Sequence, residues 1–144
     1  MIEWVKKNYT YFVAAMAIMM GAYAIIKNPS FNESRQRFNM MKRDMREIAK
    51  NGGSIATRKE VNKYGVADLS VSFIAGTLTE DVRKRNAATL SALGWTPLGR
   101  NEEAYCKKGV IYSTFLSDAT FQGWNVVIMN FRYTAQTIED CKRR

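Results

Sequence analysis

The stretch DLSVSF, residues 68–73, alternates strictly between polar and apolar side chains. Leu69, Val71 and Phe73 fall on one face of an extended chain, and the aspartate and serines between them fall on the other. A period of two is typical of a β-strand that buries one face and leaves the other in water. This stretch therefore predicts a sheet with a single core-facing side.

A helix is predicted directly downstream of this strand. Thr79 can cap it, Glu80 and Asp81 lie in its first turn, where negative charge suits the helix dipole, and Gly94 can end it. The positions expected to form its buried stripe are Val82, Asn86, Leu90 and Leu93. Further strands are predicted over 95–98, 103–107, 110–116 and 124–133, with a tight turn at 108–109 and a longer loop over 117–123.

Upstream of the strand, Thr57 and Glu60 have the spacing of a capping box, which predicts a short helix that ends by Gly65. The whole order predicts the α+β class: a small antiparallel sheet with one or two helices packed on one face, in a domain over residues 54–144.

Residues 30–50 predict an amphipathic helix that begins at a capping box of Ser30 and Glu33. Apolar residues recur on the core positions of a heptad, and the other faces carry charged residues, Asp44 among them. Two interpretations stay open: the stripe packs on the domain, or it contacts a partner. The second predicts a partner contact at Phe38, Met41, Met45 and Ile48.

No charged residue occurs between Asn8 and Ile26. At about 1.5 Å per residue, an 18-residue apolar helix spans roughly 27 Å, close to the thickness of a hydrocarbon core. We therefore expect a short basic tail over 1–8 and a transmembrane helix over 9–27. The alternatives are a signal peptide cleaved after Ala24, because 22–24 has the small-x-small form, and a buried helix of a soluble protein.

Small residues recur at helical spacing within this segment, which would let a second membrane helix approach closely. The alternative is the ordinary composition of a membrane helix. The residues of this predicted helix-pairing face are Ala14, Ala17, Gly21 and Ala24.

The two cysteines, Cys106 and Cys141, are 35 positions apart. A disulfide between them would stabilise the domain by about 4 kcal/mol through chain entropy, and such bonds persist outside the cytosol. This favours a periplasmic domain on a bacterial inner membrane. An alternative is that the two thiols are unpaired. The basic residues that follow the apolar segment favour a cytoplasmic domain under the positive-inside rule.

The chain has 144 residues, a net charge of +9 and no histidine. The absence of histidine removes the commonest general base and zinc ligand, and no glycine-rich phosphate loop is present. We therefore expect no catalytic, cofactor or metal site, and no enzyme.

These features predict a single-pass membrane protein whose domain binds another protein, as a structural or assembly component of an envelope-spanning or secretion apparatus. It could also form homo-oligomers. One alternative is an immunity or exclusion protein that neutralises an incoming toxin or element at the membrane. The other is a cytoplasm-facing basic domain that binds anionic lipid or, less in keeping with the sequence, nucleic acid.

Overall fold

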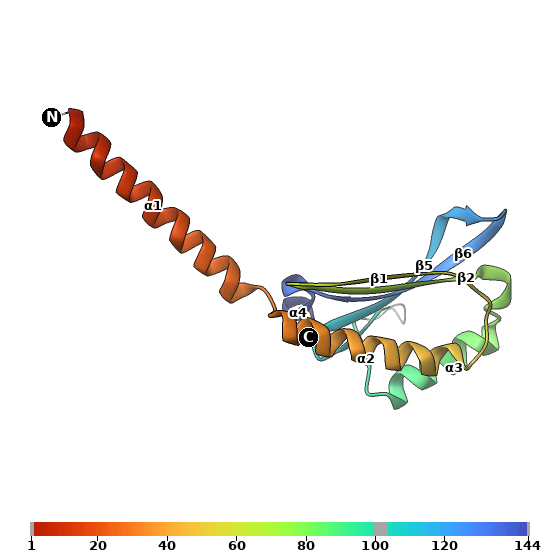
Figure 1. Ribbon diagram of the computed structural model, residues 1–144. Helices are drawn as coiled ribbons and strands as arrows, with labels where there is room; N and C mark the ends of the chain where they lie inside the picture. Colours follow the sequence, from red (N-terminus) through yellow and green to blue (C-terminus); the bar gives the residue numbers. More distant parts are fainter. Residues whose placement is uncertain (1, 100–103, 144) are drawn as a thin grey trace.

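The computed structural model describes residues 2–99 and 104–143, and within the first helix the side chains of Tyr9, residues 11–23 and Ile26. This part of the chain forms four α-helices, a 3₁₀-helix and one six-stranded sheet (Figure 1). The helices are α1 (Ile2–Lys27), α2 (Phe31–Ala49), η1 (Ala75–Thr77), α3 (Glu80–Ala92) and α4 (Ala135–Lys142). The strands are β1 (Ile55–Lys63), β2 (Val66–Ile74), β3 (Thr96–Pro97), β4 (Ala104–Lys107), β5 (Val110–Phe121) and β6 (Trp124–Tyr133). The α+β class is as predicted.

The sheet has the strand order β1-β2-β6-β5-β4-β3, and all neighbouring strands are antiparallel. The last strand, β6, therefore lies in the middle of the sheet. Its register places Phe131 opposite Leu69 of β2 on one side and Tyr112 of β5 on the other. Directly opposite residues share a face, so these three side chains gather on the same side of the sheet.

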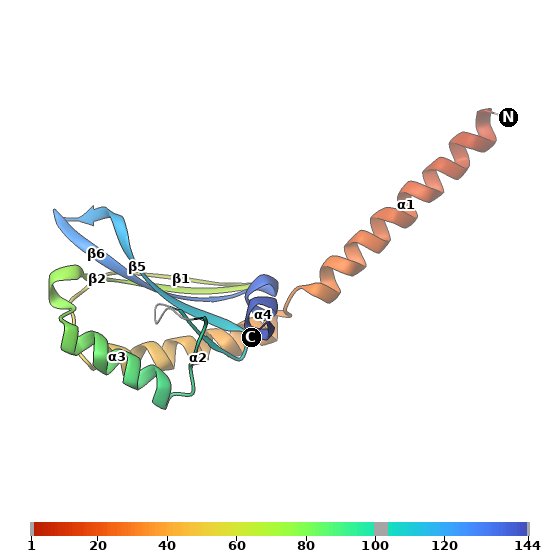
Figure 2. The same ribbon diagram turned by 180° about the vertical axis from the view of Figure 1, so that it is seen from behind.

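Helices cover one face of this sheet. In both views α2 and α3 lie along the same face, while α4 lies at one end of the sheet (Figures 1 and 2). Leu69, Val71 and Phe73 are buried on the helix-covered face, and the polar residues between them are half-buried. The alternation in 68–73 is thus confirmed as the division between the two faces.

The apolar stripe of α2 is buried inside the domain. Phe38, Met41, Met45 and Ile48 belong to the same apolar cluster as the buried residues of β2. An apolar stripe beside an apolar sheet face packs on it because both surfaces then leave water. This corrects the prediction of a partner contact at these four positions: their side chains hold α2 on its own sheet and are not open to a partner.

Residues 57–65 do not form the predicted helix. They belong to β1 and to the turn that follows it, and Thr57 lies opposite Ser72 while Glu60 lies opposite Leu69. A capping box is a local signal. Here the backbone hydrogen bonds and cross-strand contacts with β2 outweigh it.

The turn predicted at 108–109 is confirmed. Lys108 and Gly109 both have positive φ, 51° and 78°, which suits a two-residue hairpin loop. The loop predicted over 117–123 is wrong, because β5 extends to Phe121 and only Gln122 and Gly123 lie between the strands. A register shift between Leu116 and Thr120 marks an irregularity in this hairpin. Of the strand predicted over 103–107, residue 103 lies outside the described residues and the rest is β4.

A buried carboxylate joins α2 to β4. Asp44 is fully buried, and its Oδ2 accepts hydrogen bonds from Trp95 Nε1 at 3.0 Å and Lys107 Nζ at 2.6 Å. Its Oδ1 accepts a bond from Arg43 Nε at 3.1 Å. A buried charge is costly unless it is paired and hydrogen-bonded, so these three donors allow the carboxylate to lie in the core.

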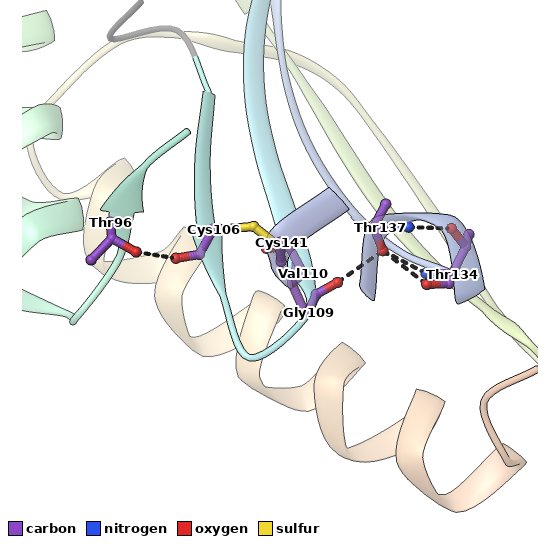
Figure 3. Close-up of a disulfide and its surroundings, with 7 residues drawn as sticks. All are labelled: Thr96, Cys106, Gly109, Val110, Thr134, Thr137 and Cys141. Carbon is purple, nitrogen blue, oxygen red and sulfur yellow. Dashed lines mark hydrogen bonds between the residues drawn. A yellow bond between two sulfur atoms is a disulfide. The ribbon is translucent and has the colours of Figure 1, made fainter. Parts of the chain in front are cut away.

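A disulfide joins Cys106 of β4 to Cys141 of α4, with 5.9 Å between the Cα atoms (Figure 3). The Thr137 hydroxyl, one turn before Cys141, donates to the carbonyl of Gly109 at 2.8 Å. The last helix is therefore held both covalently and by a hydrogen bond to the β4–β5 turn.

The first helix projects away from the domain, towards the side of the sheet opposite α2 and α3 (Figures 1 and 2). Among the helices of the described residues, none is both long and apolar enough to cross a membrane. The predicted span over 9–27 therefore has no support from the structure.

The connection between α1 and the domain is packed. Pro29 is buried, and a Cβ on Gly65, in the turn between β1 and β2, would lie 3.6 Å from Asn28 Cβ. The chain thus enters α2 in contact with the sheet.

Candidate protein-binding groove

The outer half of β5 lies at an edge of the sheet as far as the described residues extend. Residues Val110–Ser113 pair with β4 on one side, whereas the segment from Thr114 to Phe121 has β6 as its only strand partner in the described part of the chain. We call this segment the β5 edge. The unpaired backbone N–H and C=O groups of such an edge are a template for an added strand.

A groove of about 580 Å³ lies between α3 and the strands β5 and β6. It is of the size of pockets that hold ligands or peptide side chains. Its apolar lining comes mainly from Leu78, Leu90, Tyr105, Tyr112, Val127 and Met129. Thr114 and Leu116 line it as well, so the groove borders the β5 edge along one side.

The floor of the groove is neutral and aromatic. Burial raises the pKa of Tyr112 to about 12, although the hydrogen bond with Thr114 lowers it somewhat. The Thr114 hydroxyl donates to the Tyr112 oxygen at 2.8 Å, and the Tyr112 ring packs against Phe131 with 4.9 Å between centroids. This floor suits an apolar side chain.

Charged residues of α3 form the opposite rim. Arg83 and Lys84 line the groove together with Glu80, and Lys84 Nζ lies 4.0 Å from a Glu80 carboxylate oxygen. Arg83 Nε donates to the carbonyl of Leu78 at 3.2 Å, which holds its guanidinium at the rim. The rim carries one net positive charge.

Large apolar side chains are exposed where the hairpin of β5 and β6 leaves the sheet. Leu116 is 65% exposed, Trp124 61% and Phe115 49%. In both views this hairpin rises away from the helices (Figures 1 and 2). Leu116 and Phe115 also line the groove, and exposed apolar residues beside a groove are typical of an interaction surface.

The residues predicted as sites lie elsewhere. Ala14, Ala17 and Gly21 are exposed on α1, and a Cβ added to Gly21 would meet no atom within 4 Å; the side chain of Ala24 lies outside the described residues. The stripe of α2 is buried, so neither predicted partner surface borders the groove.

The groove was missed because it forms between elements that are distant in the sequence. One signal was available: Tyr112, Thr114 and Leu116 alternate within the strand predicted over 110–116, which places their side chains on one face of it. That pattern carries no sign that α3 forms the opposite wall.

The described residues contain no group of three or more cysteine, aspartate or glutamate side chains that could hold a metal ion. No protein-family model, no curated protein and no solved structure matches this chain.

Proposed function

We propose that this chain is a non-enzymatic binding protein, held at a bacterial inner membrane by α1, whose domain takes an extended segment of a protein partner along the β5 edge. The observation that carries the proposal is the combination of an open strand edge and an apolar groove beside it. Main-chain hydrogen bonds at the edge would supply affinity, and a side chain in the groove would supply specificity.

The membrane attachment is supported by the chemistry of α1. Residues 8–26 carry no charge, and the described apolar side chains of this helix, such as Phe12 and Ile18, are exposed without packing on the domain. A helix that is apolar on all sides is unfavourable in water. Lipid would cover it.

The side of the membrane is supported by the disulfide. A bond between Cys106 and Cys141 is stable in an oxidising compartment and rare in cytosol. We therefore place the domain in the periplasm, as part of an envelope-spanning assembly.

Two measurements test the attachment. The full-length chain should stay in the membrane pellet during extraction with alkaline carbonate, and its cysteines should resist a membrane-impermeant thiol reagent until reductant is added. Recovery of the chain in the soluble fraction would overturn the membrane attachment. Thiols that react only after the inner membrane is broken would place the domain in the cytoplasm instead.

Site-specific photo-cross-linking tests the binding edge. A photoreactive residue in place of Leu116 should give a cross-linked product in intact cells. The matched control is the same residue in place of Ile55, which is 52% exposed on β1 at the opposite edge of the sheet. Absence of any product at 116, or equal products at both positions, would contradict binding along β5.

A further inference from the structure

The two sides of the sheet differ in how their edges are protected. β1, with the sequence IATRKEVNK, carries four charged residues among nine: Arg58, Lys59, Glu60 and Lys63. The β5 edge, TFLSDATF, carries one, Asp118, among eight. Charged side chains on an edge strand discourage pairing with another strand, and their absence permits it. Of these two edges in the described part of the chain, the β5 edge is the one whose composition permits pairing.

We infer that the segment bound along this edge is the same edge of a second copy of this chain, paired antiparallel about a two-fold axis. This inference rests on the proposed function and names its partner. In such an isologous contact each copy presents the same surface to the other. One surface must therefore supply both the strand and its groove, and the β5 edge with its adjoining groove does so.

The side chains of the edge are complementary to the groove. Leu116 points to the face of the sheet that lines the groove, opposite Val127, yet it is 65% exposed. In the paired state each Leu116 would be covered at the junction of the two grooves. The single charge of the edge, Asp118, is negative, whereas the α3 rim has a net positive charge through Arg83 and Lys84. The edge and the rim therefore carry opposite charge, which favours a contact between two copies.

The position of α1 is compatible with this symmetry. Adjacent antiparallel strands are related by a two-fold axis perpendicular to the sheet, and rotation about that axis keeps any group on its original side of the sheet. Because α1 leaves on the side opposite α2 and α3 (Figures 1 and 2), both first helices would lie on the same side of the paired sheets. Both can then enter one membrane.

A charge-swap experiment on the full-length chain in detergent tests the pairing. Leu116→Lys alone and Leu116→Glu alone each place like charges near the axis and should raise the dissociation constant of the dimer about a hundredfold, as measured by sedimentation equilibrium. A mixture of the two variants should restore the dimer, because opposite charges then meet. Ile55→Lys should leave dimerisation unchanged, and far-UV circular dichroism should show that every variant is folded.

The inference is overturned if the unaltered chain is a monomer at all concentrations tested, or if the mixture of Lys and Glu variants stays monomeric. The cross-link at position 116 separates this failure from that of the proposed function. A product of twice the chain's mass supports the second copy. A product of another mass would show that a different protein binds the edge, which overturns pairing with a second copy but supports the proposed binding edge. Absence of any product would overturn both proposals.

Discussion

At the scale of single residues, Asp44 has an environment that its neighbours in sequence do not predict. It stands among the charged residues that mark the polar faces of a predicted amphipathic helix, yet the fold buries it completely between Trp95 and Lys107. The environment of Asp44 is set by β4 and by the segment after α3, which are distant from α2 in the sequence and contact it only in the folded chain.

Asp44→Asn should lower the free energy of unfolding by roughly 3–5 kcal/mol, because Lys107 would lose its buried counter-ion. Urea denaturation followed by tryptophan fluorescence measures this loss. The control is Glu47→Gln on the same helix, which removes only an exposed pair with Lys50 and should cost less than about 1 kcal/mol. Equal losses in the two variants would show that the buried pair contributes no more to stability than the exposed pair.

Tyr112 makes the stability of the domain sensitive to alkaline pH. Its pKa is about 12 in the folded protein against an ordinary value of 10, so the unfolded chain loses the proton first as pH rises. The stabilisation is fully present below pH 10 and is lost between pH 10 and 12, by roughly 3 kcal/mol in total.

Tyr112→Phe should flatten the dependence of the unfolding free energy on pH above pH 10. Urea denaturation at pH 9, 10 and 11 compares the slopes of the variant and the unaltered chain. Identical slopes would mean that another group governs the alkaline loss.

At the scale of elements, one turn and the strand alternation were predictable, whereas the turn between β5 and β6 and the partners of the strands were not. The pattern in 68–73 and the turn at Lys108-Gly109 are local, so the sequence carries them directly. The identity of β1 depends on pairing with β2, and a capping-box spacing suggested a helix there. The central place of β6 and the groove beside α3 depend on contacts between distant segments, for which a single sequence has no local signal.

The two hairpin turns of β5 allow a matched test of packing at an element boundary. Gly109 and Gly123 have nearly the same φ, 78° and 81°. A Cβ on Gly109 would lie 2.9 Å from Ile138 Cγ1, whereas a Cβ on Gly123 would meet nothing within 4 Å. Gly109→Ala should therefore destabilise the domain by about 1–3 kcal/mol more than Gly123→Ala. Thermal unfolding of both variants measures the difference. Equal stabilities would show that α4 can shift to accommodate the added methyl group without loss of stability.

At the scale of the whole molecule, the disulfide closes a loop that contains β5 and β6. Replacing Cys106 and Cys141 together by alanine should lower the free energy of unfolding by about 4 kcal/mol, since the unfolded chain regains its freedom. Urea denaturation of the oxidised chain and of the variant gives the value. The unaltered chain under strong reductant should match the variant; if it keeps its full stability, the bond does not stabilise the fold.

The short connection around Pro29 also limits how far the domain can lie from α1. Three residues, 28–30, separate α1 from α2, and even a fully extended chain of that length reaches only about 10 Å. Because Pro29 is buried against the domain, the free length of this connection is shorter still. If α1 is held in a bilayer, as proposed above, so short a connection keeps the domain at the bilayer surface. Partners would then meet it by lateral diffusion in two dimensions, among molecules held at the same height.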